Sequence, residues 1–231
     1  MEKTATKVSL KELYDVNWSN PLGEGAFGSV HTAIARKTGE VVAVKKISKA
    51  YTDNVSFQRE MDALLHIRQS GGHPNICGLR ENYDEGQYYY LVLDYVSGGE
   101  MFDHLCIQGP YSEADAARLI QETASALAYL HGIHIVHGDV KPENLMLSSK
   151  HSSDAIIKLV DFGCAQVTHG DDVVKRLRFT GHTELNKGVP RTPAYCSPEV
   201  LESIRTNDGG RVAPAFDMWV SCNLHFLLFM R

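Results

Sequence analysis

The chain has 231 residues, 43% of them hydrophobic, which is enough to bury the core of one large domain or of two lobes. Its formal charge is −5 and it carries no basic run, so neither nucleic acid nor an anionic membrane surface is expected as a partner. Its five cysteines are too widely spaced for a zinc pattern or a disulfide framework.

The N-terminal residues Met1–Thr4 contain no apolar signal core, and no run in the chain is long enough to span a membrane. We therefore expect no membrane insertion. A cytoplasmic protein with reduced cysteines is the expectation.

The first chemical pattern is a glycine-rich stretch with the spacing G-x-G-x-x-G, formed by Gly23, Gly25 and Gly28. The same spacing opens dinucleotide-binding folds, in which a helix follows at once. Here two β-branched runs follow instead, at 30–33 and 41–45, with a glycine turn at 37–40 between them. The pattern predicts a strand-turn-strand flap, and glycine there would let backbone N–H groups approach nucleotide phosphates.

The next segment, 54–68, places apolar residues at helical spacing and predicts a helix with Asn54 as its N-cap. Glu60 flanks the apolar stripe and could point inward to meet a lysine, whereas a solvated glutamate is the alternative. Strand-like residues 88–96 then end in a Ser-Gly-Gly break, where we place the lobe boundary.

Residues 112–131 predict a buried helix, and Ser112 and Asp115 have capping-box spacing at its start. Three histidines follow at intervals of three: His131, His134 and His137. Because no carboxylate supports them, we interpret them as packing residues and not as metal ligands.

The helix leads into the sequence IVHGDVKPENLML at 135–147, which contains an acid, a base and an amide within six positions: Asp139, Lys141 and Asn144. A second strand-like run, 156–163, also ends in an acid and a glycine, with Asp161 as the acid. Together with the flap, Lys45 and Glu60, this ordered set closely resembles a eukaryotic protein kinase domain from about residue 14 to about residue 219.

The resemblance implies an α+β, two-lobed protein kinase-like fold, with a small β-rich N-lobe and a mainly helical, incomplete C-lobe. The expected organisation is a polar leader at 1–13, the N-lobe at 14–95 and the C-lobe at 96–231. After Trp219 the sequence loses the family pattern, so the last helices of the fold are expected to be absent. Apolar residues between Leu224 and Phe229 would then be partly exposed.

The resemblance also implies roles for the site residues in transfer of a phosphoryl group from ATP. Lys45, held by Glu60, would pair with the α and β phosphates, while Asn144 and Asp161 would hold Mg²⁺. Asp139 would accept or orient the substrate hydroxyl, Lys141 would neutralise the moving phosphoryl group, and Thr192 would support both. The ATP pocket would further involve Leu22, Gly23, Gly25, Gly28, Val30, Ala43, Leu93, Asp94, Val96 and Met146.

The lysine two places after Asp139 resembles serine/threonine kinases, and the whole run looks most like the calcium/calmodulin-dependent group. Glu100 and Glu143 match positions that often meet basic residues near the target hydroxyl of a protein substrate. Gly138 stands where most of the family carries an arginine that grips an activation-segment phosphate, so one switch would be missing. The sequence does not identify a regulatory partner.

Two other functions are open. A catalytically inactive, nucleotide-binding fragment that acts through partner binding would fit the loss of the last helices and of the arginine that normally pairs with Glu199. A dinucleotide-dependent oxidoreductase has only the glycines in its favour. The motif chemistry favours an ATP- and Mg²⁺-dependent serine/threonine protein kinase.

Overall fold

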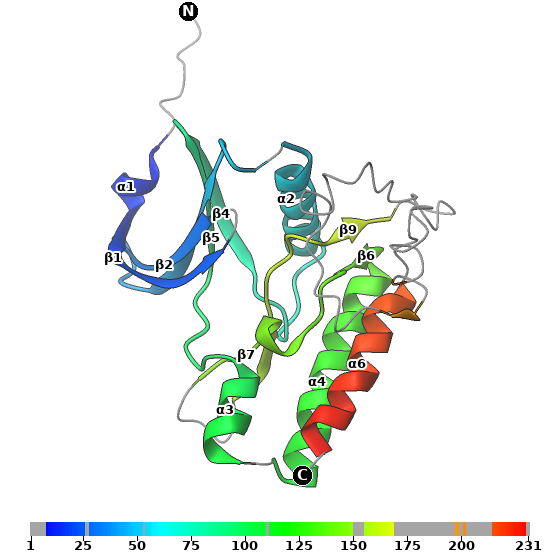
Figure 1. Cartoon of the computed structure of the whole chain (residues 1–231). Coiled ribbons are helices and arrows are strands. Elements are labelled where there is room, and N and C mark those ends of the chain that lie inside the picture. Colours follow the sequence, from blue (N-terminus) through cyan, green and yellow to red (C-terminus); the bar gives the residue numbers. More distant parts are fainter. Residues whose placement is uncertain are drawn as a thin grey trace, which may run out of the picture. The chain divides into compact units, whose positions relative to one another are not determined.

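The computed structural model describes residues 8–25, 28–52, 54–109, 111–149, 155–168, 197–198, 201 and 214–229 (Figure 1). It does not describe the side chains of 54, 56, 108 and 223–229. The chain divides into two compact units. The first comprises Met1–Asn54 and Gly78–Tyr95, and the second comprises Val55–Cys77 and Val96–Arg231.

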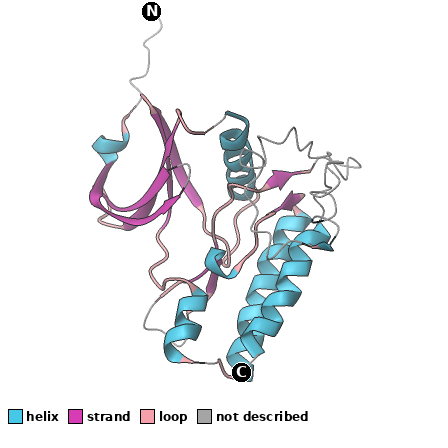
Figure 2. Ribbon diagram, in the orientation of Figure 1, coloured by secondary structure: helices cyan, strands magenta, loops and turns pink. Residues whose placement is uncertain are grey.

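The first unit is an antiparallel five-stranded sheet with the strand order β1-β2-β3-β5-β4 (Figure 2). Its elements are α1 (Leu10–Leu13), β1 (Tyr14–Gly25), β2 (Gly28–Ala35), β3 (Val41–Ser48), β4 (Leu79–Glu85) and β5 (Tyr88–Asp94). The predicted hairpin is confirmed, since β2 and β3 pair in continuous antiparallel register. The glycine-rich stretch is shared between β1 and β2, which pair from Tyr14 opposite Ala35 to Gly25 opposite Gly28.

One face of this sheet carries a hydrophobic core formed by Leu10, Tyr14, Ala33, Val42, Val44, Tyr83 and Val92. Helix α1 contributes Leu10, whose backbone N–H donates to Glu85 Oε1 at 2.7 Å. Because side chains alternate along a strand, Ala43 and Lys45 point to the opposite face from Val42 and Val44. This alternation places Ala43 and Lys45, two residues of the candidate site, on the face of the sheet opposite to the hydrophobic core.

The second unit is mainly helical, with α2 (Asn54–Gln69), α3 (Met101–Gln108), α4 (Glu113–Gly132) and α6 (Pro214–Phe229). The predicted helices at 54–68 and 112–131 are confirmed. Ser112 caps α4, because its side chain accepts a hydrogen bond from Asp115 N at 3.1 Å. The predicted cap at Asn54 lies outside the described side chains.

Helix α6 runs alongside α4, and its described inward residues include the buried Phe216, Asp217 and Val220 (Figure 1). The predicted exposure of the apolar residues from Leu224 onward lies outside the described side chains. No helix in the described part of the chain combines the length and apolar character needed to cross a membrane.

Two short ribbons follow α4. They pair β6 (Ile135–Val136) with β9 (Gln166–Val167), and β7 (Leu145–Leu147) with β8 (Ile157–Leu159). A 3₁₀ turn, η1 (Pro142–Asn144), leads directly into β7. These elements place the loop at 137–144 and the residues after β8 next to one another.

Candidate functional site

The loop between β6 and β7 brings the predicted acid, base and amide together. Lys141 Nζ donates to Asp139 Oδ2 at 2.7 Å. Asn144 Nδ2 donates to the backbone carbonyl of Asp139 at 2.8 Å and lies 3.4 Å from its Oδ2. Asp139 and Asn144 are both buried, with 7% and 6% of their surface exposed. The loop therefore holds one carboxylate between a cation and an amide.

The fold of this loop is set by local chemistry and by strand pairing. Pro142 fits the first turn of η1, because it lacks the N–H that would be unsatisfied there, and Asn144 N donates to Lys141 O at 3.0 Å. Val160 N then donates to Asn144 O at 3.0 Å, one residue before Asp161. This bond brings the backbone of Asn144 next to that of Asp161, the two predicted metal ligands.

Asp217 of α6 fixes the start of the loop from 80 residues away. Its two carboxylate oxygens accept hydrogen bonds from His137 N and Gly138 N, each at 2.9 Å. His131 Nε2 lies 3.0 Å from Asp217 Oδ2, and the carboxylate is fully buried. Sequence reasoning marked Asp217 only as the start of a helix and missed this role, since nothing in the local sequence indicates so distant a partner.

Gly138 has a backbone reason to be glycine. Its φ is +77°, which side chains disfavour, and a Cβ built on it would lie 2.8 Å from the carbonyl oxygen of Cys164. The resemblance explained this glycine only by a missing phosphate-binding arginine. The structure adds a conformational and steric cause, and the missing switch stays a prediction.

His137 is a packing residue, as the sequence indicated. It is fully buried, and its ring meets the Phe162 ring edge to face with centroids 5.0 Å apart. Its Nδ1 accepts from Asp139 N at 3.3 Å and its Nε2 lies 3.1 Å from Val160 O. An amide can only donate and a carbonyl can only accept, so the ring proton is on Nε2. His137 thus links the loop to Val160, the residue before Asp161.

Burial and neighbouring charges shift the pKa values of both Asp139 and Lys141. Burial raises the pKa of Asp139 above its ordinary value, although the hydrogen bond and charge of Lys141 act in the opposite direction. Burial lowers the pKa of Lys141, but the hydrogen bond and charge of Asp139, with the charges of Glu143 and Asp161, outweigh it and raise that pKa overall. The lysine therefore stays charged. Asp161, exposed and with φ of +60°, contributes negative charge to both residues.

Glu60 is buried on α2, with 7% of its surface exposed, so the alternative of a solvated surface glutamate is wrong. Its Oε2 lies 3.9 Å from the position that a Cβ on Gly163 would take. The side chain therefore points toward the residues that follow Asp161. Its predicted pairing with Lys45 stays a prediction.

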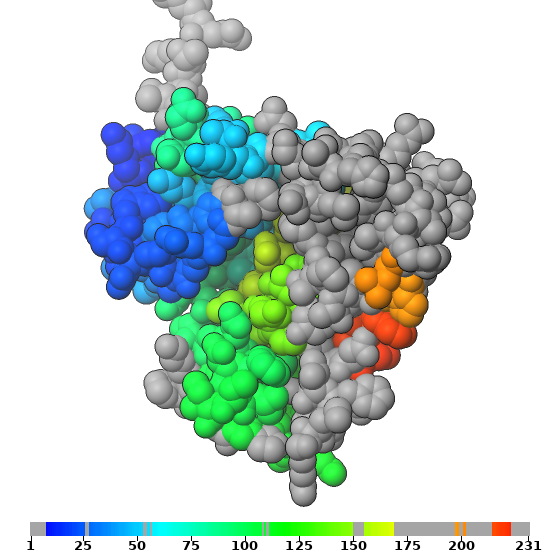
Figure 3. All heavy atoms as spheres, in the orientation of Figure 1, coloured from blue at the N-terminus to red at the C-terminus, as the bar shows by residue number. Residues whose placement is uncertain are grey.

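Glu100 and Glu143 lie in one acidic cluster. Burial raises the pKa of Glu100, and the charges of Asp103 and Glu143 raise it further. Glu100 forms an isolated antiparallel bridge with Met146 of β7. Asp103 is exposed on α3, which lies at the molecular surface (Figure 3). Sequence reasoning missed Asp103, although its place one turn after Glu100 could have indicated it.

In the first unit, strand register gathers the predicted nucleotide residues on one face of the sheet. Val30 lies opposite Lys45, and Ala43 lies opposite Leu93. Because paired residues share a face and strands alternate with period two, these four side chains share the face opposite to the hydrophobic core.

The three glycines of the flap differ in their surroundings. A Cβ on Gly28 would lie 1.8 Å from Lys46 O of β3, so strand packing itself requires glycine there. A Cβ on Gly23 or Gly25 would meet no described atom within 4 Å. Packing among the described residues therefore does not account for these two glycines. Leu22 beside them is half-exposed.

The remaining predicted residues have mixed outcomes. The carboxylate of Asp94 accepts from Arg80 Nε at 2.8 Å and from Gly78 N at 3.0 Å, so it braces the first unit. Val96 is partly exposed at the start of the second unit's longer segment. Thr192 and Glu199 lie outside the described residues.

Comparison with known proteins adds independent findings. A family profile described as a protein kinase domain matches residues 16–230. Myosin light chain kinase A of Dictyostelium discoideum is 35% identical over 194 residues, which cover 84% of this chain and 60% of that protein.

Two further relatives share similar identity. Calcium-dependent protein kinase 4 of Plasmodium berghei is 38% identical over 184 residues, covering 78% of this chain and 32% of that protein. Calcium/calmodulin-dependent protein kinase type II of Caenorhabditis elegans is 38% identical over 202 residues, covering 87% of this chain and 26% of that protein. The chain thus spans 60% or less of the length of these three relatives.

Proposed function

This chain belongs to the protein kinase family, and we propose that it transfers the γ-phosphoryl group of ATP to serine and threonine hydroxyls of protein substrates. The observation that carries the proposal is the buried Asp139 carboxylate with Lys141 Nζ at 2.7 Å and Asn144 beside it. Phosphoryl transfer requires positioned charge and little covalent chemistry from the protein, and this arrangement supplies it.

Asp139 is the residue that orients the substrate hydroxyl and receives its proton. Its raised pKa makes the ionised carboxylate a better proton acceptor than an exposed aspartate. Lys141 stays charged beside it and offers a cation to the negative charge of the transferring group. The hydroxyl oxygen forms the new bond to phosphorus, and ADP leaves with the electrons of the broken bond.

The residues of the second unit fit a divalent cation. Asn144 Nδ2 donates to Asp139, so the Asn144 Oδ1 is the atom that would bind the ion, and Asp161 would supply a carboxylate. Carboxylate and amide oxygens are the ligands that Mg²⁺ prefers, usually one or two per ion alongside phosphate oxygens. We therefore assign Mg²⁺ to Asn144 and Asp161. When bound, the ion neutralises phosphate charge.

The nucleotide roles follow from the family. Gly23, Gly25 and Gly28 would cover the phosphates, with Lys45, held by Glu60, pairing with them. Leu22, Val30, Ala43 and Met146 would contact adenine, Leu93 would be the gatekeeper, and Asp94 and Val96 would belong to the hinge. In family terms, 1–13 would be a leader, 14–95 the N-lobe and 96–231 the C-lobe, although Leu10 packs into the core of the first unit and 55–77 belong to the second unit. The open space around Gly23 and Gly25 supports this assignment.

The acidic cluster of Glu100, Asp103 and Glu143 indicates the substrate. Mutual repulsion within it is relieved by a basic side chain, which supports protein substrates with lysine or arginine near the target hydroxyl. We propose that Thr192 supports Asp139 and Lys141. We also propose that the protein acts in the cytoplasm.

The test is transfer of radiolabelled phosphate from ATP to three basic peptides that differ only in carrying serine, threonine or tyrosine. We expect label on the serine and threonine peptides, loss of transfer when Mg²⁺ is chelated, and recovery when it is restored. Label on the tyrosine peptide alone, or no label on any peptide, would refute the proposal.

A further inference from the structure

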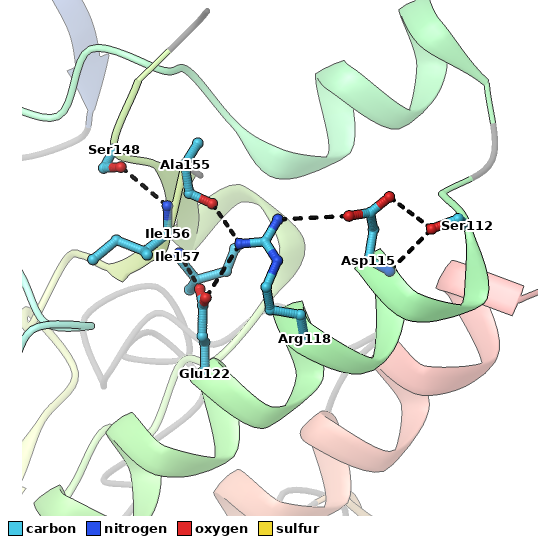
Figure 4. A network of polar contacts seen from close by, with 8 residues as sticks. All are labelled: Ser112, Asp115, Arg118, Glu122, Ser148, Ala155, Ile156 and Ile157. Carbon is cyan, nitrogen blue, oxygen red and sulfur yellow. Dashed lines mark hydrogen bonds and ion pairs between the residues drawn. The ribbon is translucent and has the colours of Figure 1, made fainter. Parts of the chain in front are cut away.

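Two side chains of α4 hold the segment that enters β8 (Figure 4). Arg118 Nη1 donates to the backbone carbonyl of Ala155 at 2.8 Å. Glu122 Oε2 accepts from Ile157 N at 2.6 Å. The two side chains are one helical turn apart and also bind each other, with Arg118 Nη1 3.3 Å from Glu122 Oε1. One ion pair thus binds both a carbonyl and an amide of the same segment.

The pair is well supported on its own helix. Asp115, three residues before Arg118, places Oδ1 3.8 Å from Arg118 Nη2, and Asp115 is itself held by the Ser112 cap (Figure 4). The Glu122 side chain is only 16% exposed. Hydrogen bonds from a backbone amide to a partly buried carboxylate are charge-assisted, which makes them stronger than neutral ones. The attachment is therefore stronger than a surface ion pair.

The attached segment leads to the predicted metal ligands. Strand β8 is only three residues long, and it pairs with β7, which begins immediately after Asn144. On its other side, Leu159 N donates to Asn75 O at 2.9 Å, and Asn75 Nδ2 donates to Ile157 O at 3.0 Å. Asp161 follows two residues after the strand.

Strand β8 is bonded to β7 on one side and to Asn75 and Cys77 on the other, and Glu122 binds the amide at which the strand begins. A slip of one residue moves the backbone by about 3.3 Å and reverses the side of every side chain. Metal–ligand distances tolerate only about 0.2 Å. The register of β8 therefore decides whether Asp161 and Asn144 can act on one nucleotide-bound cation, and Glu122 contributes the bond at its first amide.

We propose that Arg118 and Glu122 are positioning residues for phosphoryl transfer, because their ion pair fixes β8 and with it the place of Asp161 relative to Asn144. The inference rests on the proposed function and adds residues that touch neither nucleotide nor substrate. It differs from a purely structural role in predicting that the requirement for Mg²⁺ changes.

The test compares three variants of the whole chain. Glu122→Leu removes the acceptor for Ile157 N, Glu122→Gln keeps an acceptor oxygen without the charge, and Glu113→Gln changes an exposed acid on the same helix as the control. We measure the initial rate against Mg²⁺ concentration at saturating ATP, together with hydrogen exchange of backbone amides at 155–162. Arg118→Met serves as a second variant if Glu122→Leu does not fold.

We expect Glu122→Leu to need about tenfold more Mg²⁺ for half-maximal rate, since loss of a hydrogen bond to a charged group changes equilibria by about that factor. Exchange should accelerate at 155–162 and not in α4. Glu122→Gln should recover most of both, and Glu113→Gln should match the wild type. A lower melting temperature with an unchanged Mg²⁺ requirement and unchanged exchange at 155–162 would overturn the inference. If the wild type transfers no phosphate, the proposed function fails, and the exchange measurement alone decides whether Glu122 fixes β8.

Discussion

Replacing Gly138 by alanine tests how the loop that carries Asp139 is built. The residue has φ of +77°, its N–H is held by Asp217, and a Cβ would lie 2.8 Å from Cys164 O. A side chain here therefore meets two separate penalties, one conformational and one steric. The backbone cannot turn away, because the amides of Gly138 and of His137 before it are both held by the Asp217 carboxylate.

The magnitude can be estimated from each penalty. A left-handed conformation costs a non-glycine residue about 1–2 kcal/mol. Forcing an extra carbon into a packed site costs about 1–3 kcal/mol more. The sum is about 2–5 kcal/mol, and for a chain of this size each kcal/mol lowers the melting temperature by about 2–4 °C. Gly138→Ala should therefore melt about 4–20 °C below the wild type.

Two other glycines of the second unit separate the penalties in a thermal unfolding assay. Gly72 has φ of +71° but open space around its Cβ position, so Gly72→Ala should show only the conformational loss. Gly132, at the end of α4, has neither constraint, so Gly132→Ala should leave the melting temperature unchanged or raise it. If Gly138→Ala loses no more than Gly72→Ala, the steric part of the reasoning is wrong.

Three further predictions concern the site. Lys45→Met should abolish phosphate transfer while the circular dichroism spectrum stays that of the wild type, because the aliphatic stem is kept and the cation is lost; wild-type turnover would remove Lys45 from the mechanism. The acid limb of the kcat/KM profile should lie above the ordinary aspartate pKa, since burial raises the pKa of Asp139. Lys141→Met should move that limb to higher pH, because it removes a cation that favours the carboxylate. A limb that stays in place or moves to lower pH contradicts this reasoning. Asp217→Leu should lower the free energy of unfolding, measured by urea denaturation, by about 2–6 kcal/mol, because two buried amides lose their acceptor at about 1–3 kcal/mol each. Asp217→Asn should lose less, and equal losses would show that hydrogen bonding is not the cause.

The parts of the fold that the sequence predicted are those with strong local signals. The helices α2 and α4 have clear apolar periodicity, and Ser112 with Asp115 marks the start of α4. The β2–β3 hairpin follows from two β-branched runs around a glycine turn. Each of these signals depends on residues a few positions apart, so one sequence is sufficient to find it.

Other elements have no such signal. Strand β1 contains Pro21 and two glycines, which oppose a strand assignment, and it tolerates them because its pairing is irregular between Val16 and Gly23. Strands β6, β7 and β9 are two or three residues long, too short for any periodicity, and are defined by partners elsewhere in the chain, whereas β8 lies within the strand-like run predicted at 156–163.

The same contrast applies to the site. Asp139, Lys141 and Asn144 share one short motif, and the structure brings them into contact. Asp217, Arg118 and Glu122 act on backbone atoms that are distant in sequence, so their roles depend on the packing of α4, α6 and β8. Spacing within a motif reveals which residues carry the chemistry, whereas the residues that hold them in place require the tertiary structure.

The central claim is that the Asp139 cluster performs phosphoryl transfer, and the most direct measurement is the rate of transfer from ATP to a basic serine peptide by Asp139→Asn beside the wild type. The asparagine keeps the shape of the side chain and removes the proton acceptor. The account predicts a turnover about 10² to 10⁴ times lower with ATP affinity unchanged, as for other positioned bases. A variant that transfers phosphate at the wild-type rate would contradict it.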